Sequence, residues 1–169
     1  MSRSGYTDEC EDPLAYGRYR QAVDNALRGK RGQALLRDLA AALDAMAEKR
    51  LYPGSFATPE GEFCALGALA HQRSIKVDDL GNEEDCDPKK VADRFGIAKA
   101  MAAEIMDMND SYYIPMSTAV DVEICGPMRR GWPDNGLHKR RVMIPNIGHA
   151  EQRWLAMRRW VGQQLQVTA

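Results

Sequence analysis

Apolar side chains recur at the spacing of an α-helix in six segments of this 169-residue chain, and this periodicity constrains the fold more than any other feature. Positions i, i+3, i+4 and i+7 of such a segment lie on one helix face, which can pack against a core. The pattern predicts a mainly α fold, a single-domain bundle of about six helices. We expect helices from Pro13 to about residue 28 and at residues 33–49, 63–70, 88–95, 98–108 and 149–165.

Short local signals refine these helices. Asp12-Pro13 and Asp87-Pro88 each place a capping carboxylate before a proline, which is favoured at the first helical position. The run from Phe63 to Ala70 is apolar on almost every side, which predicts a buried helix. Gly67 within this run costs about 1 kcal/mol relative to alanine. We therefore expect Gly67 to lie in close contact with another helix, either the first or the last.

Residues 111–147 interrupt the helical plan. From residue 120 to residue 124, valine and isoleucine alternate with aspartate and glutamate, which predicts a half-exposed β-strand. The segment Arg141–Ile144, bounded by Pro145, is the expected partner of this strand. The result would be a small two-stranded β excursion near residues 120–145. We interpret the chain as one helical domain over residues 1–169, with residues 111–147 as an insertion within it.

Charge and composition exclude several classes of protein. The formal net charge of −1 argues against a protein that binds nucleic acid over its whole surface. Apolar runs stay short of the roughly 20 residues that span a bilayer, and the N-terminal residues turn acidic where a signal peptide needs an apolar core. The four cysteines lack the paired spacing of a zinc site or a disulfide framework. We expect a protein of the reducing cytoplasm, without membrane contact, bound metal or cofactor.

Cys64 is the residue that most invites a catalytic interpretation. It stands at the start of a predicted helix, where the helix dipole can stabilise a thiolate, and His71 or His149 could act as its base. Cys64 also lies among apolar neighbours, and His71 follows it by two helical turns, about 10 Å along the axis. We interpret Cys64 as a core residue and assign no catalytic residue. The sequence leaves enzyme activity uncertain and favours its absence.

A basic segment is the most informative surface feature. Between residues 128 and 160, eight lysines or arginines stand against two acidic residues, a local excess of six positive charges. Arginine together with an aromatic ring can bind phosphates and stack on bases. Alternatively, Arg140 or Arg141 pairs with Asp121 or Glu123 across the strands. The predicted site for an anionic partner consists of Arg129, Arg130, Trp132, His138, Lys139, Arg140 and Arg141.

Several short motifs point to a family. They are Ser2–Tyr6, Gly29–Ala34, the Cys-Ala-Leu-Gly-Ala run at Cys64–Ala68, the helix end Met108–Asp110, and Glu151–Trp154. Together they resemble a family of small proteins that bacteriophages and prophages encode and for which no activity is established. The resemblance covers roughly residues 1–110 and 148–165. Residues 111–147 look like an insertion relative to the shorter members.

The resemblance implies a phage accessory protein that acts by non-covalent binding to a component of the bacterial host. Inhibition of a host defence system would be one form of such binding. A host protein or nucleoprotein is the expected partner, and the host cytoplasm is the expected location. Two alternatives from other classes remain open. One is a nucleic-acid-binding regulator that uses the basic segment, residues 128–160, and the other is a thiol-dependent enzyme built on Cys64 and a histidine.

Overall fold

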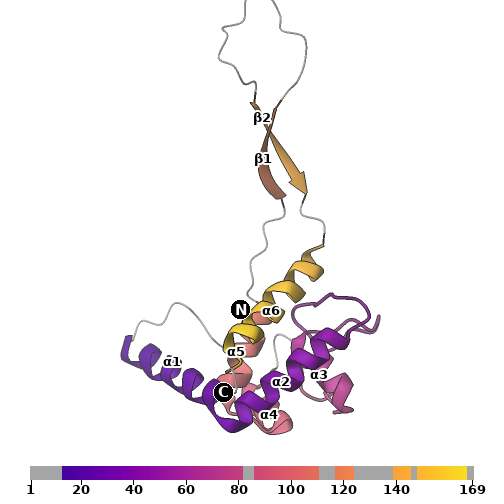
Figure 1. Cartoon of the computed structure of the whole chain (residues 1–169). Coiled ribbons are helices and arrows are strands. Elements are labelled where there is room, and N and C mark those ends of the chain that lie inside the picture. Colours follow the sequence, from indigo (N-terminus) through magenta and orange to yellow (C-terminus); the bar gives the residue numbers. More distant parts are fainter. Residues whose placement is uncertain (1–12, 82–85, 111–116, 124–138, 146–147, 167–169) are drawn as a thin grey trace, which may run out of the picture. The chain divides into compact units, whose positions relative to one another are not determined.

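The computed structural model describes residues 13–81, 86–110, 117–123, 139–145 and 148–166, and within the strands it describes only some of the side chains. This part of the chain forms six helices and one pair of strands (Figure 1), which confirms the mainly α class with a small two-stranded element. None of these helices combines the length and apolar character that a bilayer-spanning segment requires. The elements are α1 (Pro13–Arg28), α2 (Lys30–Ala45), α3 (Ala65–Arg73), α4 (Pro88–Phe95), α5 (Lys99–Asp110), β1 (Ser117–Glu123), β2 (Lys139–Pro145) and α6 (His149–Gln164).

The chain divides into two compact units. The helical unit comprises Met1–Tyr112 together with Ala150–Ala169, and the ribbon unit comprises Tyr113–His149. The ribbon unit falls on nearly the same residues as the segment that we interpret as an insertion, residues 111–147. That interpretation concerns the ancestry of the segment and stays a prediction.

The core of the helical unit gathers around α2. The leucine stripe expected from the sequence, Leu35, Leu36, Leu39 and Leu43, is buried. Full burial of each such side chain contributes about 1.5–3 kcal/mol relative to exposure, so the four leucines together contribute about as much as the net stability of a small domain. The same buried cluster includes Leu66 and Leu69 from α3, Met101 and Ile105 from α5, and Met157 and Val161 from α6.

The predicted bounds of the second helix were wrong by about three residues at its start and four at its end. α2 begins at Lys30 because Gly29 alone, with an extended backbone, makes the turn from α1. Gly32 then packs so tightly on α1 that an added Cβ would lie 2.0 Å from the Ala26 carbonyl oxygen. α2 ends at Ala45 because Met46 leaves the helical conformation. Two glycines that looked like a loop therefore form a close helix–helix junction.

The apolar run at the start of α3 is buried as predicted, whereas residues 71–73 are exposed, and the expected neighbour of Gly67 was wrong. Residues 65–70 are all buried, and the Cys64 sulfur caps the helix by accepting a hydrogen bond from the Gly67 amide at 3.3 Å. A Cβ on Gly67 would lie 1.6 Å from the carbonyl oxygen of Phe56. Phe56 belongs to the loop before α3, and its carbonyl also accepts a hydrogen bond from the Cys64 amide at 3.3 Å. Gly67 therefore accommodates loop backbone and not another helix.

The signals that bound α4 acted as predicted. Asp87 accepts a hydrogen bond from the Lys89 amide at 2.8 Å, and proline occupies the first turn. Gly96 ends the helix in the left-handed conformation, with φ of 68°, which glycine adopts without steric cost. α1 likewise begins at Pro13, whereas its expected cap, Asp12, lies outside the described residues.

α1 is fixed to α5 by a buried acid. Glu104 is buried, and both its carboxylate oxygens accept hydrogen bonds from Nη1 of Arg20, at 2.8 and 2.9 Å. Burial, followed by the nearby charges of Glu104 and Asp107, raises the pKa of Tyr19 to about 12. This ion pair joins α1 to α5 in addition to the contacts of Val23 and Leu27, which α1 contributes to the buried core.

The ribbon unit contains an antiparallel pair of strands, as the alternation predicted. In its register Val120 lies opposite Val142, Asp121 opposite Arg141, and Glu123 opposite Lys139. β2 ends at Pro145, the expected boundary. Ile124, expected at the end of the first strand, lies outside the described residues.

Candidate binding surfaces

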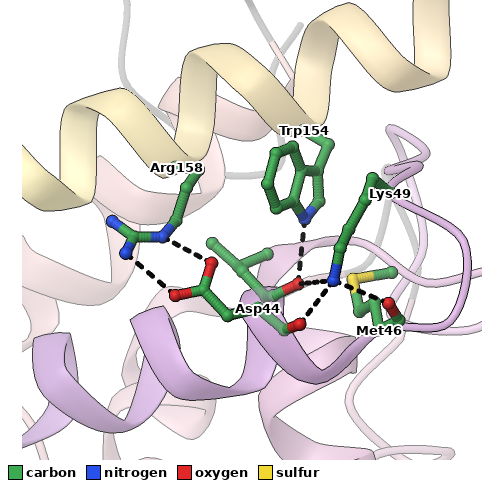
Figure 2. A network of polar contacts seen from close by, with 6 residues as sticks. Asp44, Met46, Lys49, Trp154 and Arg158 are labelled. Atoms are coloured by element: carbon green, nitrogen blue, oxygen red, sulfur yellow. Dashed lines mark hydrogen bonds and ion pairs between the residues drawn. The ribbon is translucent and has the colours of Figure 1, made fainter.

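α6 is fastened to the C-terminal end of α2. Arg158 donates two hydrogen bonds to the Asp44 carboxylate, at 2.8 and 2.9 Å, and the Trp154 indole nitrogen donates to the Leu43 carbonyl oxygen at 3.1 Å. Figure 2 shows both side chains reaching from α6 toward the last turn of α2. The hydrogen bond from Arg158 lowers the pKa of Asp44. These contacts hold the terminal helix in place in addition to its buried apolar stripe.

Lys49 completes this junction. Its ammonium group donates hydrogen bonds to the carbonyl oxygens of Leu43 at 3.4 Å and Met46 at 2.7 Å, and also to that of Asp44 (Figure 2). The same group lies 5.5 Å from the centre of the Trp154 ring. A cation at this position satisfies carbonyls that the end of a helix leaves unpaired and complements the negative end of the helix dipole.

Two of the three helix arginines counted in the basic segment make contacts within the helical unit. Arg158 is paired with Asp44, and Arg153 donates a hydrogen bond to the Asn109 carbonyl oxygen at 3.1 Å. Burial lowers the pKa of Arg153. Arg159, by contrast, is exposed. Part of the positive charge counted between residues 128 and 160 thus stabilises the fold, which weakens the support for a nucleic-acid-binding regulator.

The structure places only part of the predicted anionic-partner site. Arg129, Arg130, Trp132 and His138 lie outside the described residues. Lys139 and Arg140 lie in β2, and Arg141 beside them is exposed. The register sets Arg141 opposite Asp121, as the internal-pairing alternative expects, but it sets Arg140 opposite Val122 and Lys139 opposite Glu123.

The opposite face of the ribbon carries an exposed pair of valines. Val120 and Val142 lie directly opposite each other, with 36% and 37% of their surface exposed. Because side chains alternate along a strand, the positions of Thr118, Val122, Arg140 and Ile144 share this face with the two valines. We call the face that carries Val120 and Val142 the aliphatic face. The alternation of valine with charged residues in the sequence already indicates such a face, although it was not among the predicted sites.

Cys64 is buried as predicted, with 1% of its surface exposed. The polar contact of its sulfur among the described residues is the Gly67 amide, a capping interaction. The His71 ring instead packs against Phe63, with ring centres 5.0 Å apart, and His71 is exposed. This geometry favours the core interpretation of Cys64 over the thiol-dependent enzyme.

A cleft that the sequence analysis missed lies between the end of α2, the loop before α3, and α3 itself. Its volume is about 610 Å³, within the usual range for small-molecule sites. The guanidinium of Arg50 lies over the Tyr52 ring at 5.8 Å and contacts carboxylates of Glu48 at 3.4 Å and Glu151 at 3.3 Å. The polar and aromatic lining includes Glu48, Tyr52, Glu60, Glu62, Phe63 and His71.

Asn109 fixes the loop that forms one wall of this cleft. The side chain is buried, its oxygen accepts a hydrogen bond from the Ala65 amide at 3.1 Å, and its nitrogen donates to the Tyr52 carbonyl at 2.9 Å. Asp110 adds a hydrogen bond from the Gly54 amide at 3.2 Å. The sequence indicated Asn109 and Asp110 only as a helix end, but a buried amide must satisfy its donors and acceptors. Here it joins α5, the loop and the start of α3.

Comparisons of the chain with protein-family models, with curated proteins and with solved structures found no match. The resemblance to phage-encoded proteins therefore stays a prediction. Two surfaces of the described residues can bind a partner or ligand, the aliphatic face of the ribbon and the cleft beside α3.

Proposed function

We propose that this chain is a binding protein whose ribbon unit docks on a partner protein through its aliphatic face. The observation that carries the proposal is the exposure of the Val120–Val142 pair, 36% and 37%, at facing positions of the two strands. The helical unit has a buried core of its own and forms a separate compact unit of the chain. Binding is non-covalent, which agrees with the buried, capping position of Cys64.

The physical reason is the poor stability of an isolated ribbon. Two strands alone are marginally stable in water, and a third strand or an apolar contact is needed to hold them firmly. A cross-strand pair such as Val120 and Val142 contributes only about 0.2–1 kcal/mol. Each further Å² of apolar surface removed from water contributes about 25 cal/mol. A partner that covers the aliphatic face would therefore stabilise the ribbon as it binds.

The charges of the ribbon favour a protein partner over a nucleic acid. The two strands hold three basic residues and two acidic residues, a net charge of +1. The basic residues at 139 and 141 lie opposite the acidic residues at 123 and 121. Nucleic-acid binding depends on several cations that are available to phosphates. The surface that fits the Val120–Val142 pair is an apolar patch on another protein.

The resemblance to phage-encoded proteins supplies the class of partner. We propose a protein of the bacterial host, with a component of a defence system as one such target. The second candidate function is that of a nucleic-acid-binding regulator, in which Arg129, Arg130 and Arg140 would contact phosphates. Affinity capture separates the two candidates.

The test compares affinity capture by three forms of the full chain from nuclease-treated extract of the bacterium that carries the gene. The wild type is compared with Val120→Thr/Val142→Thr, which keeps the β-branched shape and adds hydroxyls. The third form, Arg129→Ser/Arg130→Ser/Arg141→Ser, removes charge and leaves every position of the aliphatic face unchanged. We expect a discrete protein partner with the wild type, a loss of about tenfold with the threonine variant, and a smaller loss with the serine variant.

Melting temperatures serve as the control, because both variants should melt within a few degrees of the wild type. Capture that is lost only with the serine variant and restored in low salt without nuclease would favour the nucleic-acid-binding regulator. Equal capture by all three forms would reject the ribbon as the binding surface.

A further inference from the structure

We infer that the cleft beside α3 is a binding site for an organic cation, a guanidinium or alkylammonium group carried on an aliphatic chain. This inference concerns the helical unit and is independent of the proposed docking of the ribbon. It is carried by the combination of an open cleft of about 610 Å³, two aromatic rings in its wall, and an excess of carboxylates along its lining.

The charges that line the cleft determine whether a cation or an anion fits it. Its lining holds three glutamates, at positions 48, 60 and 62, and one arginine, Arg50. Arg50 is already engaged, since its guanidinium contacts Glu48 and Glu151 and lies over Tyr52. An anion would therefore compete with carboxylates that are already in place. A cation would meet uncompensated negative charge.

Two carboxylates are available to such a cation. Within the described residues, the structure gives no ion pair to Glu60 or Glu62. The Tyr52 hydroxyl hydrogen-bonds the Glu62 side chain, which raises the pKa of Tyr52. This bond positions Glu62 beside the Tyr52 ring without neutralising its charge. Glu60 is exposed on the same loop.

The aromatic residues add affinity for a planar or alkylated cation. Rings attract cations through their electron-rich faces, by about 0.5–1 kcal/mol at exposed sites. Arg50 over Tyr52, at 5.8 Å, already demonstrates a guanidinium held by a ring and carboxylates at this place. Phe63 is held in position by the His71 ring at 5.0 Å. Met46 and alanines line the cleft as well and can contact the aliphatic part of the ligand.

The ligand chemistry has two sources, a free organic cation or the arginine side chain of a peptide. Two probes distinguish them in a titration of the ¹⁵N-labelled full chain followed by NMR. Propylguanidinium represents the free cation, and Nα-acetyl-arginine N-methylamide represents the peptide side chain. Tighter binding of the second probe assigns the site to peptides, whereas equal binding assigns it to free cations. The matching citrulline derivative has the same shape without the charge and serves as the negative control.

Three forms of the chain complete the design. Glu60→Gln/Glu62→Gln removes two charges and keeps the side-chain shape, including an acceptor for the Tyr52 hydroxyl. Asp24→Asn is the control, because it removes an acidic charge far from the cleft. Asp24 lies on α1 near the start of α2, whereas the cleft lies at the other end of α2, and the 16 residues of that helix span about 24 Å. We expect saturable shifts at Tyr52, Phe63 and His71 with a dissociation constant in the millimolar range. The double variant should weaken binding by about fivefold and Asp24→Asn by less than about twofold.

Four outcomes would overturn the inference. They are the absence of saturable shifts at about 50 mM probe, equal binding of the citrulline derivative, unchanged affinity of the double variant, and shifts confined to residues outside the cleft. The melting temperature of the double variant, which should match the wild type within a few degrees, shows that a loss of binding is not a loss of folding.

Discussion

The indole nitrogen of Trp154 donates a hydrogen bond to the carbonyl oxygen of Leu43 at 3.1 Å. This one contact joins residues that lie 111 positions apart in the chain and ties the C-terminal helix to the last turn of α2. Lys49 lies over the same indole ring and caps the same turn. The junction explains why α6 belongs to the helical unit although the ribbon unit precedes it in the sequence.

Replacement of Trp154 by phenylalanine tests this junction. Phenylalanine keeps an aromatic ring but cannot donate to the Leu43 carbonyl, which would lose a hydrogen bond of about 0.5–1.5 kcal/mol. Weaker attraction of Lys49 to the smaller ring adds to the loss. We expect Trp154→Phe to lower the free energy of unfolding by about 1–2 kcal/mol in urea titrations. Leu155→Ala, at a position 54% exposed on the same helix, is the control and should change it by less than about 0.5 kcal/mol.

Gly67→Ala should destabilise the protein severely. The new Cβ would lie 1.6 Å from the Phe56 carbonyl oxygen, so the loop or α3 would have to move. Gly17→Ala is the matched control in the interior of α1, where a Cβ meets nothing within 4 Å. It should stabilise the protein by about 0.5–1 kcal/mol through better helix propensity. Thermal melts of the two variants should therefore shift in opposite directions, and a Gly67→Ala protein as stable as the wild type would contradict the close packing.

The pKa of Tyr19 predicts a loss of stability at high pH. Because the folded-state pKa of about 12 lies above the ordinary value of 10.0, the folded protein holds this proton more tightly than the unfolded chain does. The corresponding stability is complete below about pH 10 and is lost as the pH rises from about 10 to about 12. Between these values the stability advantage of the wild type over Tyr19→Phe should decrease. Urea titrations of the two proteins at a series of pH values measure this difference, and a difference that stays constant with pH would contradict the prediction.

Thiol labelling tests the interpretation of Cys64. The residue is 1% exposed, and its sulfur accepts a hydrogen bond from the Gly67 amide. In the native protein a thiol reagent should therefore modify Cys64 far more slowly than the half-buried Cys86. Mass spectrometry of peptides after timed labelling at neutral pH gives both rates in one sample. Faster modification of Cys64 than of Cys86 would mean an activated, accessible thiol, and the enzyme alternative would return.

Signals that act over a few residues were sufficient for several elements. Asp87, Pro88 and Gly96 bounded α4 correctly, because a cap, a fixed φ and a left-handed terminus are each decided by the residue itself. The start of α2 failed for the opposite reason. Gly32 looks like a loop residue in the sequence, but in the structure it provides space for the backbone of α1. Close packing between segments is set by tertiary structure and leaves no periodic signal.

The candidate sites depended even more on contacts between distant residues. A count of charges along the chain could not show that Arg158 meets Asp44 or that Arg153 meets the Asn109 carbonyl. The cleft likewise combines residues from α2, the loop and α3, none of which forms a motif alone. The ribbon was better predicted, because strand alternation fixes which side chains share a face once the register is known.

The docking of the aliphatic face is the central claim, and photo-crosslinking inside cells of the host bacterium tests it most directly. A photoreactive aromatic residue at position 142 samples the ribbon, and the same residue at position 155, exposed on α6, samples the helical unit. We predict a discrete protein adduct from position 142 that untagged wild-type chain suppresses and the Val120→Thr/Val142→Thr chain does not. Adducts from position 155 alone, or none from position 142 while the tagged protein remains folded, would contradict the account.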